Sequence, residues 1–301
     1  MTLTQLDYIV AIDTHRHFAT AAEHCHVTQP TLSMQIQKLE DELGVLLFDR
    51  SKHPVVPTET GQLIVAQARE VLQASRRIPE MARESRDDVG GDLRVGIIPT
   101  LAPYLLPYFI SAFMARYPAV TIQLQELLTE QIVERLRTGL LDVGVVVTPL
   151  RENNMVEIPL FKEPFMLYAA TGNELLKKQK ISPDDLKNEG LWLLSEGHCF
   201  RDQVLNLCGN SHQGNKMLRY ETGSLETLVR LIDRQDGFTL LPYLATLDFD
   251  AARRKQLRPF SGVPPVRQVS LVMHRSFLKR GLINALRREI LVNLPEGLAR
   301  E

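Results

Sequence analysis

The stretch Val27-Thr28-Gln29-Pro30-Thr31-Leu32-Ser33 marks the start of the helix that decides the fold of the N-terminal region. Thr28 suits the N-cap, because its hydroxyl can accept a hydrogen bond from a free N–H of the first turn. Pro30 is tolerated early in a helix, where its missing N–H would have no partner. Apolar side chains follow at helical spacing, at Leu32, Ile36, Leu39 and Leu43, and Gly44 suits the helix end.

Two shorter helical patterns precede this helix, around residues 6–13 and 18–25, so the region predicts a helix-turn-helix. Its second helix would present short polar side chains and amides to base edges in the major groove. The candidate DNA-binding residues there are Thr28, Gln29, Pro30, Thr31, Ser33, Met34, Gln35 and Lys38. Residues 48–57 predict a wing, whose Arg50 and Lys52 are candidate phosphate contacts. The alternative is an amphipathic helical hairpin with a solvated polar face.

Charge gives this prediction no support. The chain of 301 residues has a net charge of −1, and residues 1–58 contain four Lys or Arg against seven Asp or Glu, a net charge of −3. A DNA-binding domain usually carries a basic patch, so the case rests on motif geometry. The length allows two or three domains, and neither a secretion signal nor a run of about 18 apolar residues is present. We therefore expect a cytoplasmic protein whose three cysteines do not form a structural disulfide framework.

Residues 59–89 predict one long linker helix, started by Thr58. Its seam alternates spacings of four and three, which is typical of a helix that pairs with a copy of itself. The seam residues are Ile64, Ala68, Val71, Ser75, Ile78 and Ala82. The pattern predicts a dimer, with a bend expected at Pro79.

Beyond Gly90 and Gly91 the pattern changes to alternating strands and helices, which indicates an α/β region of two lobes. Strands are predicted at 93–98, 120–126, 142–147, 164–170, 191–194, 238–241 and 269–273, and helices at 101–117, 131–138 and 282–294. The fold class is an α+β multidomain protein. Its expected domains are a winged helix-turn-helix (1–58), a linker or dimerisation helix (59–89) and an effector domain (90–301), with lobe I at 90–162 plus 268–301 and lobe II at 163–267.

A possible redox switch lies between residues 198 and 208. Cys199 follows His198 and stands close to Arg201 and Asp202. The Arg201 guanidinium favours the thiolate, and Asp202 can hold Arg201 or the imidazole in place. Cys199 is therefore the candidate attacking thiol and Cys208 the candidate resolving thiol, joined through a sulfenic acid.

The spacing of these two cysteines gives the switch a mechanical consequence. In a helix, residues nine positions apart lie about 13 Å apart along the axis and on opposite faces, whereas a disulfide needs Cα atoms about 4.4–6.8 Å apart. If the intervening segment is helical when reduced, forming the bond must remodel it. The alternative is two buried cysteines that never meet.

Several motifs resemble those of the LysR-type transcriptional regulators. They are Phe18-x-x-Ala21-Ala22, the stretch from Val27 to Glu40, Leu43-Gly44 and Leu47-Phe48-x-Arg50. The resemblance covers essentially the whole chain. It implies a winged helix-turn-helix joined to a two-lobed effector domain like a periplasmic binding protein.

Within that family, the stretch from Gly197 to Gln203 with a second thiol at Cys208 resembles the members that sense hydrogen peroxide. The resemblance implies that peroxide oxidises Cys199 and that Cys208 closes an intramolecular disulfide. It also makes Thr100 and Thr129 candidates for orienting the peroxide, and Arg267 a second basic group near the pocket. The alternative for each threonine is a helix N-cap.

A metal site is not expected. His15, His17, His24, Cys25 and His26 are suitable ligand types, but their spacing is not that of a zinc site. We predict structural packing for them, with Cys25 in the core rather than in redox chemistry. No cofactor is expected.

The function predicted is a peroxide-responsive transcriptional activator, not an enzyme. Its expected partners are promoter DNA, hydrogen peroxide as signal, further copies of the chain in a homodimer or homotetramer, RNA polymerase, and a cytosolic thiol reductant of the glutaredoxin or thioredoxin type. Two alternatives stay open. One is a LysR-type regulator that binds a small metabolite between the lobes, and the other is a thiol peroxidase, against which the helix-turn-helix argues.

Overall fold

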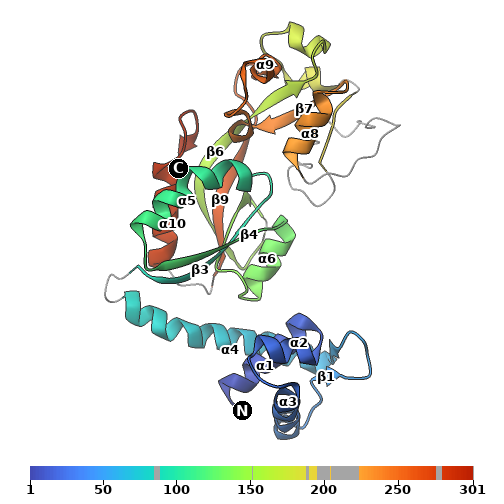
Figure 1. The fold of residues 1–301 in the computed structure, drawn as a ribbon, viewed down its shortest axis with the longest axis vertical. Coiled ribbons are helices and arrows are strands. Elements are labelled where there is room, and N and C mark those ends of the chain that lie inside the picture. Colours follow the sequence, from blue (N-terminus) through green and yellow to red (C-terminus); the bar gives the residue numbers. More distant parts are fainter. Residues whose placement is uncertain are drawn as a thin grey trace. The chain divides into compact units, whose positions relative to one another are not determined.

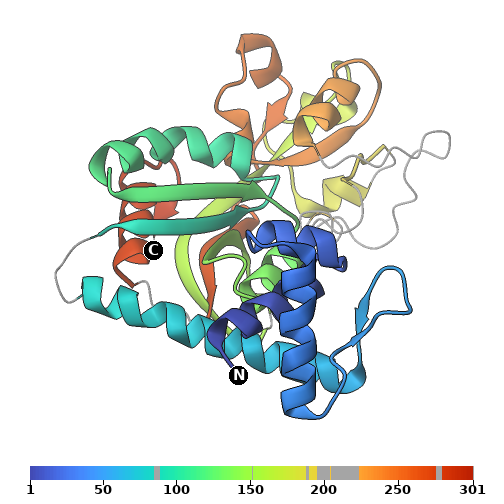
Figure 2. The same cartoon turned by 60° about the horizontal axis from the view of Figure 1, so that its bottom comes forward.

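The structure is a computed structural model that describes residues 1–84, 89–150, 152–187, 190–194, 204, 224–275 and 280–300. The chain forms two compact units, Met1–Arg86 and Asp87–Glu301. The first unit consists of helices and a small two-stranded sheet, and the second is built on a mixed sheet (Figure 1, Figure 2).

The first unit has the helix-turn-helix and wing that the sequence predicts. Its elements are α1 (Leu3–His15), α2 (Phe18–His24), α3 (Gln29–Leu43), β1 (Phe48–Asp49), β2 (Val56–Pro57) and α4 (Glu59–Glu84). Strands β1 and β2 pair antiparallel. Helix α3 begins after Thr28, whose side chain accepts a hydrogen bond from the Thr31 N–H, and it ends at Gly44, where φ is 68°. Both predicted ends of α3 are confirmed.

The core of this unit lies between α1, α2, α3 and the first half of α4. Leu32, Ile36 and Leu39 of α3 are fully buried, as the apolar spacing predicts. Because these three side chains face inward, the opposite face of α3 is available to solvent.

Helix α4 buries one face against α1 through Val65, Ala68 and Leu72. Ala68 was predicted to lie on the pairing seam, but α1 covers it. Val71 and Ile78, also seam positions, are 37% and 70% exposed. The helix continues past Pro79 and ends at Glu84.

The second unit alternates strands and helices. Its elements are β3 (Gly91–Ile97), α5 (Ala102–Arg116), β4 (Val120–Glu126), α6 (Thr129–Arg137), β5 (Val143–Thr148), β6 (Met155–Ala169), η1 (Glu174–Lys177), η2 (Pro183–Lys187), α8 (Leu225–Ile232), β7 (Phe238–Pro242), η3 (Tyr243–Thr246), α9 (Ala251–Arg254), β8 (Leu257–Arg258), β9 (Val266–His274), α10 (Arg280–Val292) and β10 (Ala299–Arg300).

The sheet runs in the order β10-β6-β9-β5-β3-β4, and β7 and β8 also pair with β6. Strand β3 is parallel to both β4 and β5, whereas β9 is antiparallel to β5 and β6. Helices α5 and α10 cover one face and α6 the other (Figure 1). Strand β5 is buried along its whole length, as expected for a strand covered on both faces.

Two separate hydrophobic clusters fill this unit. The first contains β3, β5 and α5, and the second contains β7, α8 and the end of β6. Strand β6 runs through both, with Phe161 in the first cluster and Phe165 in the second. The residues between these two phenylalanines therefore lie where one lobe passes into the other.

One predicted strand is wrong. Residues 191–194 were expected to form a strand, but only Leu191 makes an isolated bridge, to Phe238. The stretch is nevertheless buried, since Trp192 is 8% exposed and its indole N–H donates to the Asp236 carbonyl at 3.0 Å. The apolar side chains of this segment are buried in the second cluster, although its backbone forms no sheet ladder.

Candidate DNA interface and effector site

The outer face of α3 and the wing carry the residues predicted to bind DNA. Exposed among them are Thr28, Gln29, Pro30, Thr31, Met34, Lys38, Arg50 and Lys52, and half-buried are Ser33 and Gln35. Because the apolar stripe of α3 faces inward, the polar residues of α3 lie on the outer side of the helix, and Arg50 and Lys52 of the wing lie on the surface of the same unit. This is the arrangement that a helix-turn-helix needs to place a helix in the major groove.

Arg50 is held by two contacts to α3 and one to α2. Its guanidinium donates to Glu40 Oε2 at 3.0 Å and to Ser33 Oγ at 3.2 Å, and it lies 5.1 Å from the Phe18 ring centroid. Part of its charge is thus used to hold the wing against α3. Lys52 is 65% exposed and 3.8 Å from Asp49, whereas Arg50 is 41% exposed, so Lys52 is the more exposed cation of the wing.

Glu40 is a residue of this site that sequence reasoning missed. It is 5% exposed, and its Oε1 accepts hydrogen bonds from the Leu47 and Phe48 N–H groups at 2.7 and 3.4 Å. It therefore ties the second half of α3 to the first wing strand. The available signal was a carboxylate four residues after Ile36, at a position that faces the core.

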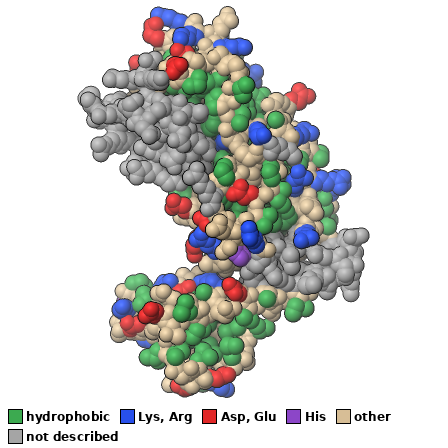
Figure 3. Space-filling view, turned by 180° about the vertical axis from the view of Figure 1, so that it is seen from behind, with side chains coloured by type: hydrophobic (Ala, Val, Ile, Leu, Met, Phe, Trp, Pro, Cys, Tyr) green, Lys and Arg blue, Asp and Glu red, His purple; other side chains and the backbone are tan. Residues whose placement is uncertain are grey.

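The described residues on the face shown in Figure 3 include Lys and Arg as well as Asp and Glu side chains. Residues 1–58 have a net charge of −3. Within the described residues, Lys38 forms no ion pair and is exposed. It is therefore the cation of α3 best placed for a phosphate oxygen.

In the second unit, Thr100 and Arg267 come into direct contact. Arg267 donates from Nη1 to Thr100 Oγ1 at 2.9 Å and from Nη2 to the Thr100 carbonyl at 3.1 Å. Both residues are 2% exposed. The pair joins the loop after β3 to the start of β9, although 167 positions separate the two residues.

Glu163 completes this cluster and was not predicted. It faces Arg267 across the β6–β9 pair, and its Oε2 accepts from Arg267 Nε at 2.8 Å. Its Oε1 accepts from the Leu244 N–H at 2.8 Å. The side chains of Glu163 and Arg267 are 0% and 1% exposed, so the pair is fully desolvated. The sequence signal was a carboxylate in an apolar strand.

Thr129 lies at the same edge of the sheet as Thr100. Strands β3 and β4 are parallel and pair Ile97 with Glu126, and each threonine stands three residues after its member of that pair. The crevice outside the carboxyl ends of parallel strands is a usual ligand position in open α/β sheets. The structure thus brings both threonines to an edge suited to a small ligand.

Neither threonine is the N-cap that the alternative interpretation gave it. The N-cap of α5 is Leu101, without a side-chain hydrogen bond. The N-cap of α6 is Leu128, whose N–H donates to Gln131 Oε1, and Thr129 is the first residue of the helix. In place of capping, the Thr100 hydroxyl receives the Arg267 N–H.

A hydrogen bond joins the two lobes beside this cluster. Tyr104 on α5 packs against both hydrophobic clusters, and its hydroxyl donates to Glu226 Oε1 on α8 at 3.3 Å. Burial first, and then the Glu226 carboxylate, raise the pKa of Tyr104 above its usual value, while Arg267 opposes the shift. Tyr104 therefore stays a protonated donor at neutral pH.

The thiol part of the predicted site lies outside the described residues. This applies to His198, Cys199, Arg201, Asp202 and Cys208. Cys25 is described, and it is half-buried at the end of α2 rather than fully buried. Burial, and to a smaller extent the Asp7 carboxylate, raise the pKa of its thiol, so little thiolate is available for reaction.

Comparison with known protein families adds the deciding observation. Residues 3–62 match the bacterial regulatory helix-turn-helix proteins of the LysR family, and residues 86–294 match the LysR substrate binding domain. The chain belongs to the LysR family.

Its LysR relatives include named peroxide regulators. The chain is 36% identical over 278 residues to a hydrogen peroxide-inducible genes activator from Haemophilus influenzae, which covers 90% of both chains. It is 39% identical over 245 residues to the DNA-binding transcriptional dual regulator OxyR of Escherichia coli, over 81% of this chain and 80% of that one. Among solved structures, a full-length OxyR variant from Pseudomonas aeruginosa matches with a TM-score of 0.81 and 38% identity, over 96% of this chain and 94% of that one.

Three further observations concern the described residues of this chain. In that part, no group of three or more His, Cys, Asp or Glu side chains is placed to hold a metal ion. The rings of His15 and His24 are in contact, with centroids 4.8 Å apart and planes tilted by 50°. No helix among the described residues has both the length and the apolar character to cross a membrane.

Proposed function

We propose that this protein is a peroxide-responsive, DNA-binding transcriptional activator of the OxyR type, switched by a reversible disulfide between Cys199 and Cys208. The observation that carries the proposal is the similarity to hydrogen peroxide-inducible genes activators over 90% of the chain, in a sequence that has both thiols. The buried cluster of Thr100, Arg267 and Glu163 supports it, because it supplies fixed polar groups at a ligand-binding edge.

The proposed chemistry consumes one peroxide for each disulfide. The Cys199 thiolate attacks one peroxide oxygen, the O–O bond breaks, and hydroxide leaves and takes up a proton to form water. The Cys208 thiol then attacks the sulfenic sulfur, and a second water leaves as the S–S bond forms. His198, Arg201 and Asp202 favour the thiolate in this proposal, while Thr100, Thr129 and Arg267 orient the peroxide.

The proposed partners follow from the two units. Promoter DNA would bind the outer face of α3 and the wing. A second copy would pair along α4, where Leu63, Val71 and Ile78 are 72%, 37% and 70% exposed beside the face that α1 covers. Dimers would pair into a homotetramer and act on RNA polymerase in the cytoplasm, and a glutaredoxin or thioredoxin type reductant would reset the disulfide. In this role the protein is a regulator and not an enzyme.

Cys199→Ser tests the switch. Addition of one equivalent of peroxide is expected to reduce the titratable thiols of the unfolded wild-type chain from three to one, and to leave both thiols of Cys199→Ser titratable. A reporter promoter should respond to peroxide with the wild type and not with this variant. Cys25→Ser is the control, and it should respond like the wild type because the Cys25 thiol is poorly ionised.

The same experiment separates the alternatives. A reporter response that persists in Cys199→Ser would contradict the proposed switch and favour a metabolite-sensing regulator. Continuous peroxide consumption by the wild type with a thiol reductant, at rates far above one turnover per switching cycle, would favour a thiol peroxidase.

Lys38→Ala tests the DNA interface. Loss of one phosphate contact should weaken binding about equally for all DNA sequences and reduce the slope of log affinity against log salt by about 1. The measurement is fluorescence anisotropy of a duplex selected by the wild-type protein, over a range of salt concentrations. Lys38→Arg is the control and should keep the slope. An unchanged slope in Lys38→Ala would exclude Lys38 as a phosphate contact.

A further inference from the structure

We propose that Gln5 is a positioning residue that fixes the orientation of the Gln35 amide, so that Gln35 presents its NH2 group to DNA and reads a hydrogen-bond acceptor on a base edge. The inference rests on the proposed DNA-binding function and deepens it, because it specifies the base chemistry that one position of α3 selects.

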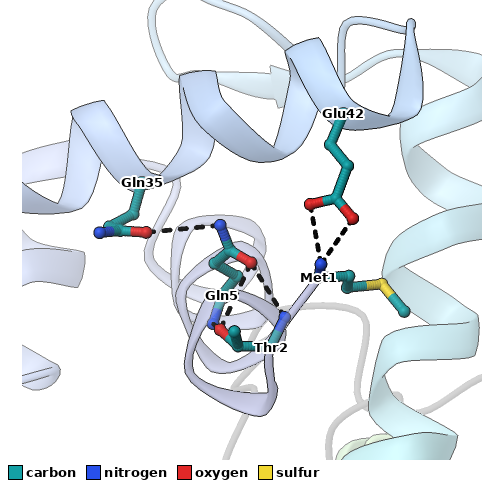
Figure 4. A network of polar contacts seen from close by, with 5 residues as sticks. All are labelled: Met1, Thr2, Gln5, Gln35 and Glu42. Atoms are coloured by element: carbon teal, nitrogen blue, oxygen red, sulfur yellow. Dashed lines mark hydrogen bonds and ion pairs between the residues drawn. The ribbon is translucent and has the colours of Figure 1, made fainter.

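The amide of Gln5 has only one orientation open to it. Gln5 lies on α1 and is 4% exposed. Its side-chain Oε1 accepts a hydrogen bond from the Thr2 backbone N–H at 2.9 Å, and the Gln5 backbone N–H donates to Thr2 Oγ1 at 3.2 Å (Figure 4). A backbone N–H can only donate, so the amide atom that faces Thr2 must be the oxygen. The Gln5 Nε2 is therefore directed away from Thr2.

This constraint passes to α3 through one contact. Gln5 Nε2 lies 3.4 Å from Gln35 Oε1. Because an amide nitrogen can only donate, Gln35 must turn its oxygen toward Gln5. Its NH2 group then points away from Gln5, as Figure 4 shows. The Thr2 N–H thus fixes the orientation of the Gln5 amide, and the Gln5 amide fixes that of the half-buried Gln35 amide.

The exposed NH2 restricts what Gln35 can read. A glutamine that makes a bidentate contact with adenine accepts from N6 with its amide oxygen and donates to N7 with its amide nitrogen. Here the oxygen already accepts from Gln5, and the outward group is a donor. Guanine N7 and O6, adenine N7 and thymine O4 are acceptors that suit it, whereas the N4 amino group of cytosine is a donor and does not. Gln35 is therefore expected to contact a base that presents a hydrogen-bond acceptor at its major-groove edge.

Gln5→Glu makes a sharp test, because it alters no group that touches DNA. A carboxylate at position 5 still accepts from the Thr2 N–H, but it turns a second acceptor toward Gln35. The Gln35 amide then rotates about its last torsion, a two-fold rotor, to donate inward and expose its oxygen. The base preference at that position should change from an acceptor edge to the amino group of adenine or cytosine.

The experiment is selection of duplexes from a randomised library by the full-length protein, followed by sequencing. The wild type should favour guanine or thymine over cytosine about fivefold at the position read by Gln35, and Gln5→Glu should favour cytosine over guanine or thymine by a similar factor. Adenine carries both an acceptor and a donor and does not separate the two proteins. Gln35→Ala should lose the preference at that position only. Gln35→Glu, which keeps an acceptor toward Gln5 and exposes one to DNA, should select a donor base by a second route. Gln37→Glu controls for the added charge on an exposed position of α3 and should keep the wild-type preference.

The outcomes separate the inference from the proposed function. Enrichment of a sequence by the wild type with the same base preference in Gln5→Glu overturns the role of Gln5. Equal weakening of all sequences by Gln35→Ala overturns base reading and leaves a phosphate contact. Failure of the wild type to enrich any sequence overturns the DNA-binding function itself, and the inference with it.

Discussion

Glu163→Ala is expected to lower the free energy of unfolding of the second unit by about 3–5 kcal/mol, the usual cost of removing one partner from a buried ion pair. The Arg267 guanidinium would be left 1% exposed without its carboxylate, and the Leu244 N–H would lose its acceptor. The loss should be large because no water reaches either group to replace the missing contact. Urea unfolding followed by the fluorescence of Trp192, the only tryptophan in the chain, reports on this unit.

Two variants bracket this effect. Glu163→Gln keeps an oxygen for the Arg267 or Leu244 N–H but removes the charge, so its loss of stability should be smaller than that of Glu163→Ala. Glu174→Ala removes a carboxylate from an ion pair with Lys177 whose side chains are 71% and 79% exposed, and it should change stability little. Equal stability of Glu163→Ala and Glu174→Ala would contradict the structural role assigned to the buried pair.

Gly61→Ala is expected to destabilise the first unit by about 3 kcal/mol, although alanine is the better helix former by about 1 kcal/mol. Gly61 is buried in the first turn of α4, where a Cβ would lie 2.0 Å from the Leu47 carbonyl oxygen. That carbonyl cannot yield easily, because it also accepts the Thr58 N–H at 2.9 Å. The alanine must therefore push α4 away from the wing.

Amide hydrogen exchange of α3 and of the wing measures the effect, because the only tryptophan lies in the second unit. Faster exchange in Gly61→Ala is the expected result, together with weaker DNA binding. Gln62→Ala is the matched control at the next, exposed position, and it should change stability by less than about 0.5 kcal/mol. A Gly61→Ala variant more stable than the wild type would show that helix propensity outweighs the close contact.

The elements that could be predicted are those with a strong local pattern. The cap at Thr28 and the apolar spacing from Leu32 to Leu39 define α3 in isolation, because capping and periodicity depend on neighbours in the chain. The all-apolar stretch from Val143 to Val147 likewise indicates a buried strand. The strand predicted at 191–194 was wrong, because an apolar run indicates burial but does not specify a partner strand.

The residue types of the candidate site could be predicted from the sequence, but their hydrogen-bond partners could not. Thr100 and Arg267 were named through family resemblance, yet their mutual hydrogen bonds join positions 167 residues apart. Glu163 and Gln5 were missed because each has its partner in a distant segment, and Glu40 was missed because its partners lie beyond the turn that follows α3. Ala68 was placed on a pairing seam, and only the packing of α1 shows that the seam is partly covered.

By itself the sequence determined that this chain begins with a helix-turn-helix and a wing, continues into a long helix and ends in an α/β region, since these follow from caps, periods and turns within a few residues. Tertiary structure alone decided which polar groups meet: Arg267 with Glu163, Arg50 with Glu40, Gln35 with Gln5. The physical reason is that a buried or half-buried polar group must find a partner wherever the fold brings one, and sequence distance sets no limit on that choice.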